Sequence, residues 1–313
     1  MQGRHYETGY FYDAAVLALA CLFSAACAHP QGYIDFTQPE GPRPAVEQSG
    51  VKPLRIAFAS VMSPRETRQV YQQIVTYIAQ KQQRPAVLIQ RRTYEELNAL
   101  LANGDADIAF SSTGAYAAYQ GQVPIELLAM TETNGTSHYQ TYIITAADSD
   151  IHDFSQLRGK VFAFTDPLSY SGCLAIKFLL ARDGTTPEIF FNRFFYTHGH
   201  DKSLWSVANH LADAAGIDSQ IYELMADTNP ALAKEVRILE ALPEAPTGPI
   251  VVRSDLDPAE KEELRHIFYT MHEDADLAKA MKNIVIDRFI PPDSAAYETF
   301  KQQYQAQKRL AGT

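Results

Sequence analysis

Cysteine is scarce in this sequence of 313 residues, which holds only Cys21, Cys27 and Cys173. Cys21 lies inside an apolar segment near the N-terminus, and Cys27 directly follows that segment. If the segment is removed and Cys27 carries a lipid, Cys173 has no cysteine to pair with, so a disulfide framework is excluded. We expect Cys173 to pack as a small apolar residue.

Positive charge is scarce as well. Lysine and arginine number 27 against 37 aspartates and glutamates, which gives a formal net charge of -10. No basic patch stands out, and this argues against a nucleic-acid partner. The remaining composition, 46% hydrophobic and 20% charged, is ordinary for a soluble globular protein. The length allows two modest domains or one large domain.

The apolar run over residues 14–26 is too short to span a bilayer. Small residues end it immediately before Cys27, which is the pattern of a bacterial secretory signal with a lipoprotein-type cleavage site. We expect residues 1–27 to be a signal peptide and Cys27 to be lipidated; a plain cleaved signal and an uncleaved anchor are the alternatives. Residues 28–53 are rich in Pro, Gly and Gln, which predicts a flexible tether.

From Leu54 onward, short apolar runs typical of strands alternate with helical patterns. This alternation predicts a mostly parallel sheet in an α/β fold. Strands are predicted at 54–59, 86–89, 107–110, 125–130 and 142–144, and helices at 64–83 and 94–103.

A weak internal repeat suggests two lobes of similar topology. Residues 101–112 and 207–218 each read as a helix end, a turn, an Asp before a short strand, and a polar loop. Two such lobes joined by two crossing segments enclose a cleft, and ligands of these sheets sit at the carboxyl ends of the strands. The predicted parts are lobe 1 (54–146 and 252–313), lobe 2 (147–251), crossings near 145–151 and 249–253, and closing helices on lobe 1 at 258–271, 275–283 and 294–307.

The sequence Asp-Pro-Leu-Ser-Tyr-Ser-Gly at 166–172 lies between a predicted strand at 160–164 and a helical run at 173–180. The first turn of a helix carries unpaired backbone N–H groups and the positive end of the helix dipole. Two serine hydroxyls and Gly172 at this position favour an anion site. The alternative is an ordinary serine cap with a glycine that permits close packing.

These motifs resemble the phosphate/phosphite/phosphonate-binding proteins of bacterial ABC transporters over the chain from about Leu54 onward. The resemblance is carried by 166–172 followed by Gly199-His200-Asp201, with support from Tyr94 and from 107–110, 157–160 and 249–253. It implies a two-lobed, hinge-closing α/β fold of the type II periplasmic-binding-protein kind. It also implies that Ser169, Tyr170 and Ser171 hold a phosphorus oxyanion, that His200 donates to it, and that Tyr94 faces it from lobe 1.

The departures from that family bear on the ligand. Tyr170 stands where Thr is common, Gln220 and Gly248 stand where binders of aminoalkylphosphonates carry acidic residues, and Ser111, beside Ser112, stands where they carry tyrosine. The resemblance therefore implies phosphate, phosphite or a small phosphonate with an uncharged tail, held by a site that includes Ser111 and Ser112. Asp218 is the remaining nearby carboxylate. It either accepts a hydrogen bond from a protonated P–OH group or simply caps the following helix.

We therefore predict a monomeric, extracytoplasmic binding lipoprotein at a bacterial membrane, periplasmic or on the cell surface, without catalysis, cofactor or metal. It would deliver a small phosphorus oxyanion to an ABC permease. One alternative is a ligand-binding partner of a membrane sensor. A further alternative is a periplasmic hydrolase built on Ser169, His200 and Asp218, although residue types alone do not establish a triad. Residues 198–201 match no zinc pattern, and we expect Trp205 in the core.

Overall fold

The computed structural model describes residues 51–59 and 61–310, which belong to one compact unit, Ser49–Thr313. The predicted signal peptide, the lipidated Cys27 and nearly all of the predicted tether lie outside the described residues. No helix among the described residues is long and apolar enough to cross a membrane.

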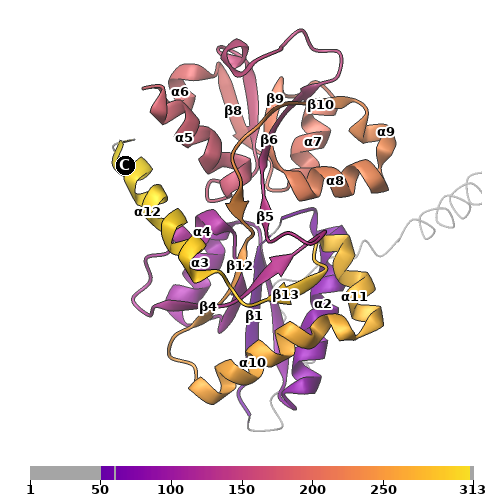
Figure 1. The fold of residues 1–313 in the computed structure, drawn as a ribbon, viewed down its shortest axis with the longest axis vertical. Helices are drawn as coiled ribbons and strands as arrows, with labels where there is room; N and C mark the ends of the chain where they lie inside the picture. Colours follow the sequence, from indigo (N-terminus) through magenta and orange to yellow (C-terminus); the bar gives the residue numbers. More distant parts are fainter. Residues whose placement is uncertain (1–50, 60, 311–313) are drawn as a thin grey trace, which may run out of the picture. The chain divides into compact units, whose positions relative to one another are not determined.

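A six-stranded sheet with the order β13-β4-β12-β3-β1-β2 forms the first lobe (Figure 1). β1 pairs in parallel with β2 and β3, whereas β12, β4 and β13 add antiparallel strands. The sheet is therefore mixed, and the prediction of a mostly parallel sheet was wrong, because an apolar strand pattern does not mark the direction in which the strand runs. β1 is buried along nearly its whole length, as expected of a parallel strand covered on both faces. Its strands are β1 (Leu54–Ala59), β2 (Ala86–Arg91), β3 (Ile108–Phe110), β4 (Ile125–Glu132), β12 (Pro249–Arg253) and β13 (Arg288–Ile290), and its helices are α2 (Pro64–Lys81), α3 (Tyr94–Asn103), α4 (Thr113–Ala118), α10 (Pro258–Thr270) and α11 (Ala275–Met281).

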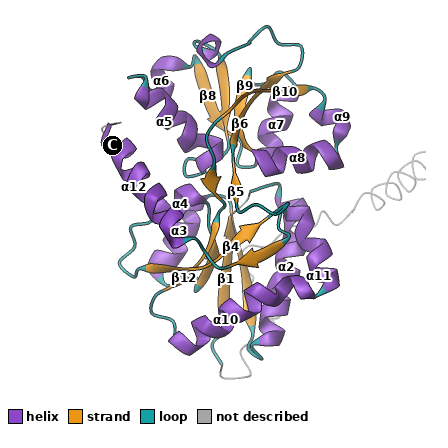
Figure 2. Cartoon of the chain, viewed as in Figure 1, coloured by secondary structure: helices purple, strands orange, loops and turns teal. Residues whose placement is uncertain are grey.

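A five-stranded sheet with the order β10-β6-β9-β7-β8 forms the second lobe (Figure 2). β7 pairs in parallel with β8 and β9, and β6 runs antiparallel to both β9 and β10. Its strands are β6 (Thr141–Ala146), β7 (Val161–Phe164), β8 (Arg193–Tyr196), β9 (Ala214–Asp218) and β10 (Val236–Ala241), and its helices are α5 (Ala175–Arg182), α6 (Pro187–Phe190), α7 (His200–Ala208), α8 (Ser219–Thr228) and α9 (Pro230–Ala233). Single short turns lie at Phe154–Leu157, Tyr170–Leu174, Met271–Glu273 and Lys282–Ile284.

The two crossing segments pair with each other. β5 (His138–Tyr139) runs antiparallel to β11 (Ala245–Pro246) in a small two-stranded sheet between the lobes. The predicted boundaries therefore need correction. β6 was assigned to lobe 1, yet it belongs to the second sheet, and β12, which was taken as the return crossing, already lies in the first sheet. An apolar strand pattern carries no mark of the sheet that the strand joins, so the sequence could not place either strand.

The predicted internal repeat is present. α3 ends at Asn103 shortly before β3, and α7 ends at Ala208 shortly before β9. A capping box of Thr93 and Glu96 starts α3, and Gly104 with a φ of 74° ends it. The loops that follow β3 and β9 are thereby brought to the carboxyl edges of the two sheets.

The last helix, α12 (Ser294–Leu310), contacts both lobes (Figure 1). The Tyr297 ring lies 5.6 Å from the Tyr116 ring of α4. The Phe300 ring lies 4.8 Å from the Tyr170 ring of the second lobe in an edge-on arrangement. We predicted α12 on lobe 1, and the structure shows that it also packs against lobe 2.

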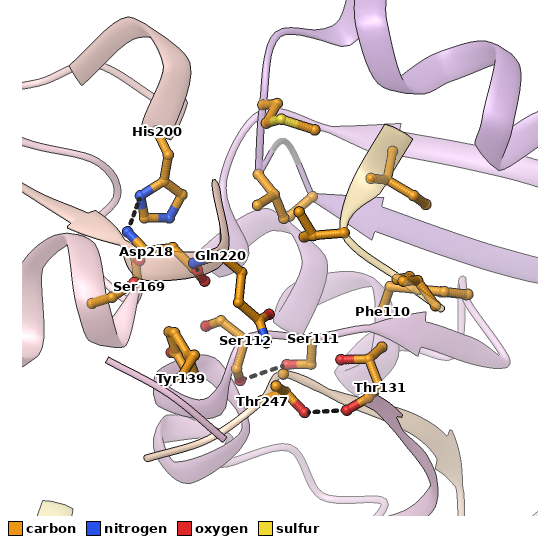
Figure 3. Close-up of a pocket in the computed structure, with 18 of the residues that line it drawn as sticks. Phe110, Ser111, Ser112, Thr131, Tyr139, Ser169, His200, Asp218, Gln220 and Thr247 are labelled. Carbon is orange, nitrogen blue, oxygen red and sulfur yellow. Dashed lines mark hydrogen bonds between the residues drawn. The ribbon is translucent and has the colours of Figure 1, made fainter. Parts of the chain in front are cut away.

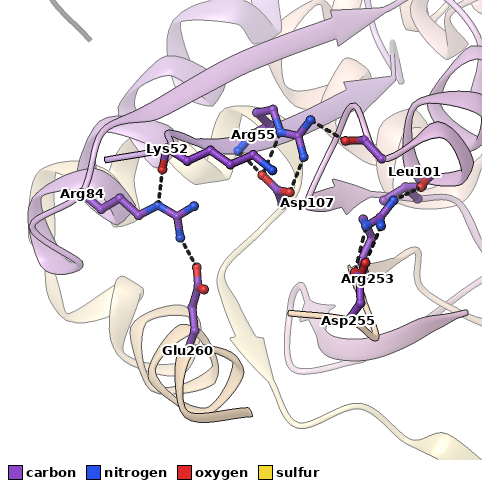
Figure 4. A network of polar contacts seen from close by, with 9 residues as sticks. Lys52, Arg55, Arg84, Leu101, Asp107, Arg253, Asp255 and Glu260 are labelled. Carbon is purple, nitrogen blue, oxygen red and sulfur yellow. Dashed lines mark hydrogen bonds and ion pairs between the residues drawn. The ribbon is translucent and has the colours of Figure 1, made fainter. Parts of the chain in front are cut away.

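A polar network holds the first sheet at the amino ends of its strands (Figure 4). The Arg55 guanidinium contacts both oxygens of Asp107, at 2.5 Å from Nη2 to Oδ1 and 3.0 Å from Nε to Oδ2. Asp107 Oδ2 also accepts from the Arg55 backbone N–H at 2.8 Å. This bidentate pair joins β1 to the start of β3, so the Asp107 motif is structural and lies at the strand ends opposite the loops.

Of the predictions for Cys173 and Trp205, the first is confirmed and the second is not. Cys173 is fully buried and free, as predicted. The prediction for Trp205 was wrong, since half of its surface is exposed. The buried face of α7 is filled by Leu204 and Val207, and Trp205 falls between them on the outer side of the helix.

Candidate functional site

A pocket of about 110 Å³ lies between the lobes at the carboxyl ends of β1, β3, β7 and β9. This position is the one where ligands bind in open α/β sheets. The volume is below the roughly 300–1,000 Å³ of sites for drug-sized ligands, which points to a small ligand. The residues that line the pocket are Ala59, Val61, Met62, Tyr71, Tyr94, Phe110, Ser111, Ser112, Thr131, Tyr139, Ser169, Ser171, His200, Asp218, Gln220, Thr247, Gly248, Ile250, Ile284, Val285 and Ile286.

The structure brings nearly all the predicted site residues together around this pocket. Those that line it are Tyr94, Ser111, Ser112, Ser169, Ser171, His200 and Asp218. Tyr170 does not line it. Its ring turns away and packs 4.8 Å from the ring of Phe300 and 6.3 Å from that of Tyr139. The large aromatic at this position therefore stabilises the contact with α12, and its hydroxyl is not presented to the pocket.

The predicted strand–turn–helix arrangement around Ser169 and Ser171 is present, with a π-helical turn, Tyr170–Leu174, in front of α5. Ser169 caps this turn, since its Oγ accepts from the Gly172 N–H at 3.1 Å. A Cβ at Gly172 would lie 2.4 Å from Thr165 Cβ, so only glycine permits this approach. Ser169 and Ser171 are both buried, and they face the pocket from the start of the helix.

His200 is held in one tautomer. Its Nδ1 accepts the backbone N–H of Asp218 at 3.1 Å (Figure 3), so the ring proton resides on Nε2. Thr165 Oγ1 lies 3.3 Å from the same nitrogen. Burial lowers the pKa of His200 to about 4. The imidazole is therefore neutral near pH 7 and offers an Nε2–H donor.

Asp218 caps α8 and also lines the pocket. Its Oδ1 accepts from the N–H groups of Gln220 at 2.8 Å and Ile221 at 3.4 Å, so the capping alternative is confirmed. Burial raises the pKa of the carboxyl to about 7, against the lowering effect of the two backbone donors. Asp218 retains some surface, which faces the pocket, and an enclosed pocket solvates a charge poorly.

The first-lobe wall of the pocket comes from the loop after β3. Ser112 caps α4, since its Oγ accepts from Ala115 N–H at 3.0 Å, and the same hydroxyl donates to Leu168 O of the other lobe at 2.9 Å. A Cβ on Gly248 would lie 2.4 Å from Ser111 O. The backbone at Gly248 is thus packed against this loop, and an acidic side chain would not fit there without movement.

Further bonds cross between the lobes. Asp201, at the start of α7, accepts the Ser63 N–H at 3.1 Å and also contacts the Ser63 hydroxyl. The His200 backbone N–H donates to Val61 O at 3.0 Å. The Tyr94 N–H donates to Asp166 at 3.3 Å. The lobes are therefore closed on one another around the pocket.

Sequence reasoning left several lining residues out of the candidate site. Tyr139 comes from the crossing strand β5, and Gln220, Thr131 and Thr247 add polar groups. Gln220 was marked only by comparison with the resembling family, Tyr139 was one of several tyrosines that could line a cleft or serve as packing, and no local pattern marks Thr247. Among the residues that the structure describes, no lysine or arginine lines the pocket. Within the described part of the chain, no group of three or more His, Cys, Asp and Glu residues is arranged to hold a metal ion.

Comparison with known proteins identifies the family of this chain. A family described as "ABC transporter, phosphonate, periplasmic substrate-binding protein" matches residues 56–297. The chain belongs to this family of phosphonate substrate-binding proteins. A curated family relative, the phosphonates-binding periplasmic protein of Escherichia coli K12, is 26% identical over 152 residues, which are 47% of this chain and 44% of the relative. The matched region therefore spans less than half the length of that relative.

Solved structures share the phosphonate-family fold. The binding protein component of an ABC phosphonate transporter from Pseudomonas aeruginosa is 21% identical, with a TM-score of 0.73 over 82% of this chain and 89% of its own. PhnD1 from Prochlorococcus marinus, solved with methylphosphonate, is 16% identical, with a TM-score of 0.73 over 83% of this chain and 98% of its own. The predicted two-lobed α/β binding-protein fold is thereby confirmed.

Proposed function

We propose that this family member captures a small phosphorus oxyanion by closure of its two lobes and delivers it to an ABC permease. The observation that carries the proposal is the convergence of Ser169, Ser171 and His200 of lobe 2 on one pocket that Tyr94 closes from lobe 1. The class of ligand is phosphate, phosphite or a small phosphonate with an uncharged tail.

The donors around the pocket are neutral. His200 carries its proton on Nε2, and burial raises the pKa of Tyr94 well above its usual value, so its phenol stays protonated. Neutral hydroxyl and N–H donors hold an oxyanion without a formal counter-charge when they are preorganised in a site shielded from water. A closed site of this kind recognises geometry and protonation state more than charge alone.

The opposite side of the pocket suits an uncharged substituent. Phe110, Ile250, Ile284 and Ile286 supply apolar surface. Among the described residues that line the pocket, the single carboxylate is that of Asp218, which lies beside His200 on the lobe 2 side (Figure 3). A buried ammonium group needs a paired charge. We therefore propose that aminoalkylphosphonates bind more weakly than methylphosphonate or phosphite.

Binding without catalysis is supported by the geometry of Ser169, His200 and Asp218. In a hydrolytic triad, the histidine Nδ1–H donates to the carboxylate of the aspartate. Here His200 Nδ1 accepts from the backbone N–H of Asp218 instead, and the Asp218 carboxylate is used as a helix cap. The chain that would activate Ser169 is therefore not formed.

The location and partners complete the proposal. We propose a monomeric protein that acts on the periplasmic side or at the cell surface, anchored through a lipid on Cys27. The short crossing strands β5 and β11 would serve as the hinge. The closed lobes would present the bound ligand to the permease, and the anchor would keep the protein near the membrane.

The test is a ligand screen on the chain from residue 28 onward. Thermal melting is recorded with phosphate, phosphite, methylphosphonate, 2-aminoethylphosphonate and sulfate, and positive ligands are measured by calorimetry. We expect a phosphorus oxyanion to raise the melting temperature, because a ligand that binds only the folded state stabilises it. Methylphosphonate or an inorganic oxyanion should exceed 2-aminoethylphosphonate. No shift with any of the phosphorus oxyanions would refute the proposal.

A further inference from the structure

The amide nitrogen of the Gln220 side chain lines the pocket and has no hydrogen-bond partner among the described residues. Gln220 is the second residue of α8, and its backbone N–H is used by the Asp218 cap. Its side chain extends away from His200 and toward Ser111 and Ser112 of the other lobe (Figure 3). The residue is only 9% exposed. Within the described residues, its Nε2 is buried and has no hydrogen-bond acceptor.

Such a group points to a ligand. Buried polar side chains are almost always hydrogen-bonded, because an amide N–H removed from water without an acceptor destabilises the fold. The amide of Gln220 lines the pocket, so an acceptor on a bound molecule would satisfy it. The oxyanion donors Ser169 and His200 lie on the lobe 2 side, away from the end of the Gln220 side chain (Figure 3). The acceptor therefore belongs to the substituent of the ligand.

The hydroxyls opposite the Gln220 amide have already used their protons. Ser111 Oγ donates to Ser112 O at 3.2 Å, and Thr247 Oγ1 donates to Thr131 O at 2.8 Å. Each oxygen keeps lone pairs that can accept. This side of the pocket thus presents one unused amide donor from lobe 2 and hydroxyl acceptors from lobe 1.

We propose that the natural ligand is a small phosphonate whose substituent carries a hydroxyl group. The hydroxyl oxygen accepts a hydrogen bond from Gln220 Nε2, and the hydroxyl group donates a hydrogen bond to the Ser111 or Thr247 side-chain oxygen. This inference rests on the proposed function and specifies its ligand class. It also makes Gln220 the residue that selects the substituent.

Other substituents match this arrangement less well. A methyl group leaves the Gln220 amide unpaired. An ammonium group has donors but no acceptor, so it leaves Nε2 unpaired as well and finds no carboxylate at this end. A carboxylate satisfies Gln220 but places a further charge in a pocket that Phe110 and Ile250 line with apolar surface.

The experiment compares sets of isosteric ligands by calorimetry. One set is hydroxymethyl-, ethyl- and aminomethylphosphonate, and the other is 2-hydroxyethyl-, propyl- and 2-aminoethylphosphonate, with methylphosphonate as the common reference. The proteins are the wild type, Gln220→Leu, Gln220→Glu, and Gln73→Leu as a matched control on an exposed position of α2. Melting curves establish that each variant is folded.

In the wild type and the control, we expect the hydroxyl member of at least one set to bind at least about fivefold more tightly than its methyl-ended isostere. Gln220→Leu should reduce that ratio to about one, because it should weaken the hydroxyl-bearing ligands more than methylphosphonate. Gln220→Glu should shift the preference toward the ammonium-bearing isostere, because it supplies the missing charge. The last variant tests the contact even if the leucine substitution fails to fold.

Several results would overturn the inference. Equal binding of hydroxyl and methyl isosteres by the wild type, or a ratio unchanged in Gln220→Leu, would remove the substituent contact. An equal loss for every ligand, methylphosphonate included, would assign Gln220 to the oxyanion instead. In these cases methylphosphonate still binds the wild type, so the proposed function stands. If no phosphonate, phosphate or phosphite binds the wild type, the proposed function itself fails and this inference fails with it.

Discussion

The protonation of Asp218 should be visible in the stability of the ligand-free protein. Burial raises the pKa of this carboxyl from 3.8 to about 7. Between pH 3.8 and about pH 7, Asp218 of the folded protein keeps a proton that the same residue of the unfolded chain has released. The stabilisation is therefore complete below about pH 4 and is lost as the pH rises through 7. At about 1.4 kcal/mol per pKa unit, the upper limit is about 4 kcal/mol.

Asp218→Asn isolates this effect, because asparagine caps a helix well and does not titrate. The pocket-facing surface of Asp218 retains some solvation, so we expect about half of the upper limit, or about 2 kcal/mol. Urea unfolding of both proteins at pH 4.5, 6, 7 and 8 gives the difference in free energy of unfolding. We expect the variant to gain on the wild type as the pH rises. A difference that stays constant with pH would refute the buried, pocket-facing carboxyl.

The titration of His200 should change the free energy of unfolding with pH in the opposite direction. Burial lowers its pKa from 6.5 to about 4, so its contribution is present above pH 6.5 and is lost as the pH falls to 4. In the wild type, the slopes of His200 and Asp218 oppose each other between about pH 4 and 6.5. Asp218→Asn should expose the His200 slope, with stability that rises with pH over this range. The wild type and Asp218→Asn are both measured without ligand, so the result does not depend on the ligand class.

The same carboxyl should set anion selectivity. Above pH 7 an ionised Asp218 can accept a hydrogen bond from an oxyanion that keeps one proton, whereas sulfate has no proton to offer. Discrimination of phosphate over sulfate should therefore grow more steeply from pH 5.5 to 8 in the wild type than in Asp218→Asn, in which only the titration of phosphate itself remains. Dissociation constants for both anions decide this, and an identical ratio in the two proteins at pH 8 would restrict Asp218 to helix capping.

Three further predictions concern the donors and the closure contacts. Ser171→Ala should weaken oxyanion binding by about 1.5–3 kcal/mol, which is the range for a hydrogen bond to a charged group. The control Ser155→Ala, on the lobe 2 surface, should leave the affinity unchanged. Calorimetry that shows unchanged affinity in folded Ser171→Ala would reject the contact. His200→Ala should lower oxyanion affinity and EDTA should leave it unchanged, so loss of binding on chelation would favour a metal site. Asp201→Ala removes the hydrogen bonds to Ser63 and so destabilises the closed state. The affinity for every ligand should therefore fall by a similar factor, about tenfold. An altered ratio of affinities between ligands would contradict this role.

Several features could be predicted from the sequence because their causes are local. The alternation of apolar runs with helical patterns determined the α/β class, and strand–turn–helix at 160–180 placed Ser169 and Ser171 at the start of a helix. The capping signals of α3, Thr93 with Glu96 and Gly104, fixed the bounds of that helix. These features depend on residues a few positions apart, so the chain specifies them without knowledge of its partners.

The remaining features depend on contacts between distant segments. Only the tertiary structure showed that β6 joins the second sheet, that the Tyr170 ring packs on Phe300, and that Asp201 reaches Ser63. The same holds for Gln220. Its sequence neighbours predict a helix start, and only the folded structure shows that its unpaired amide nitrogen faces Ser111 across the pocket. Local sequence determined the elements and their caps, and the packing of the lobes decided which side chains face the pocket, because burial is a property of the assembled chain.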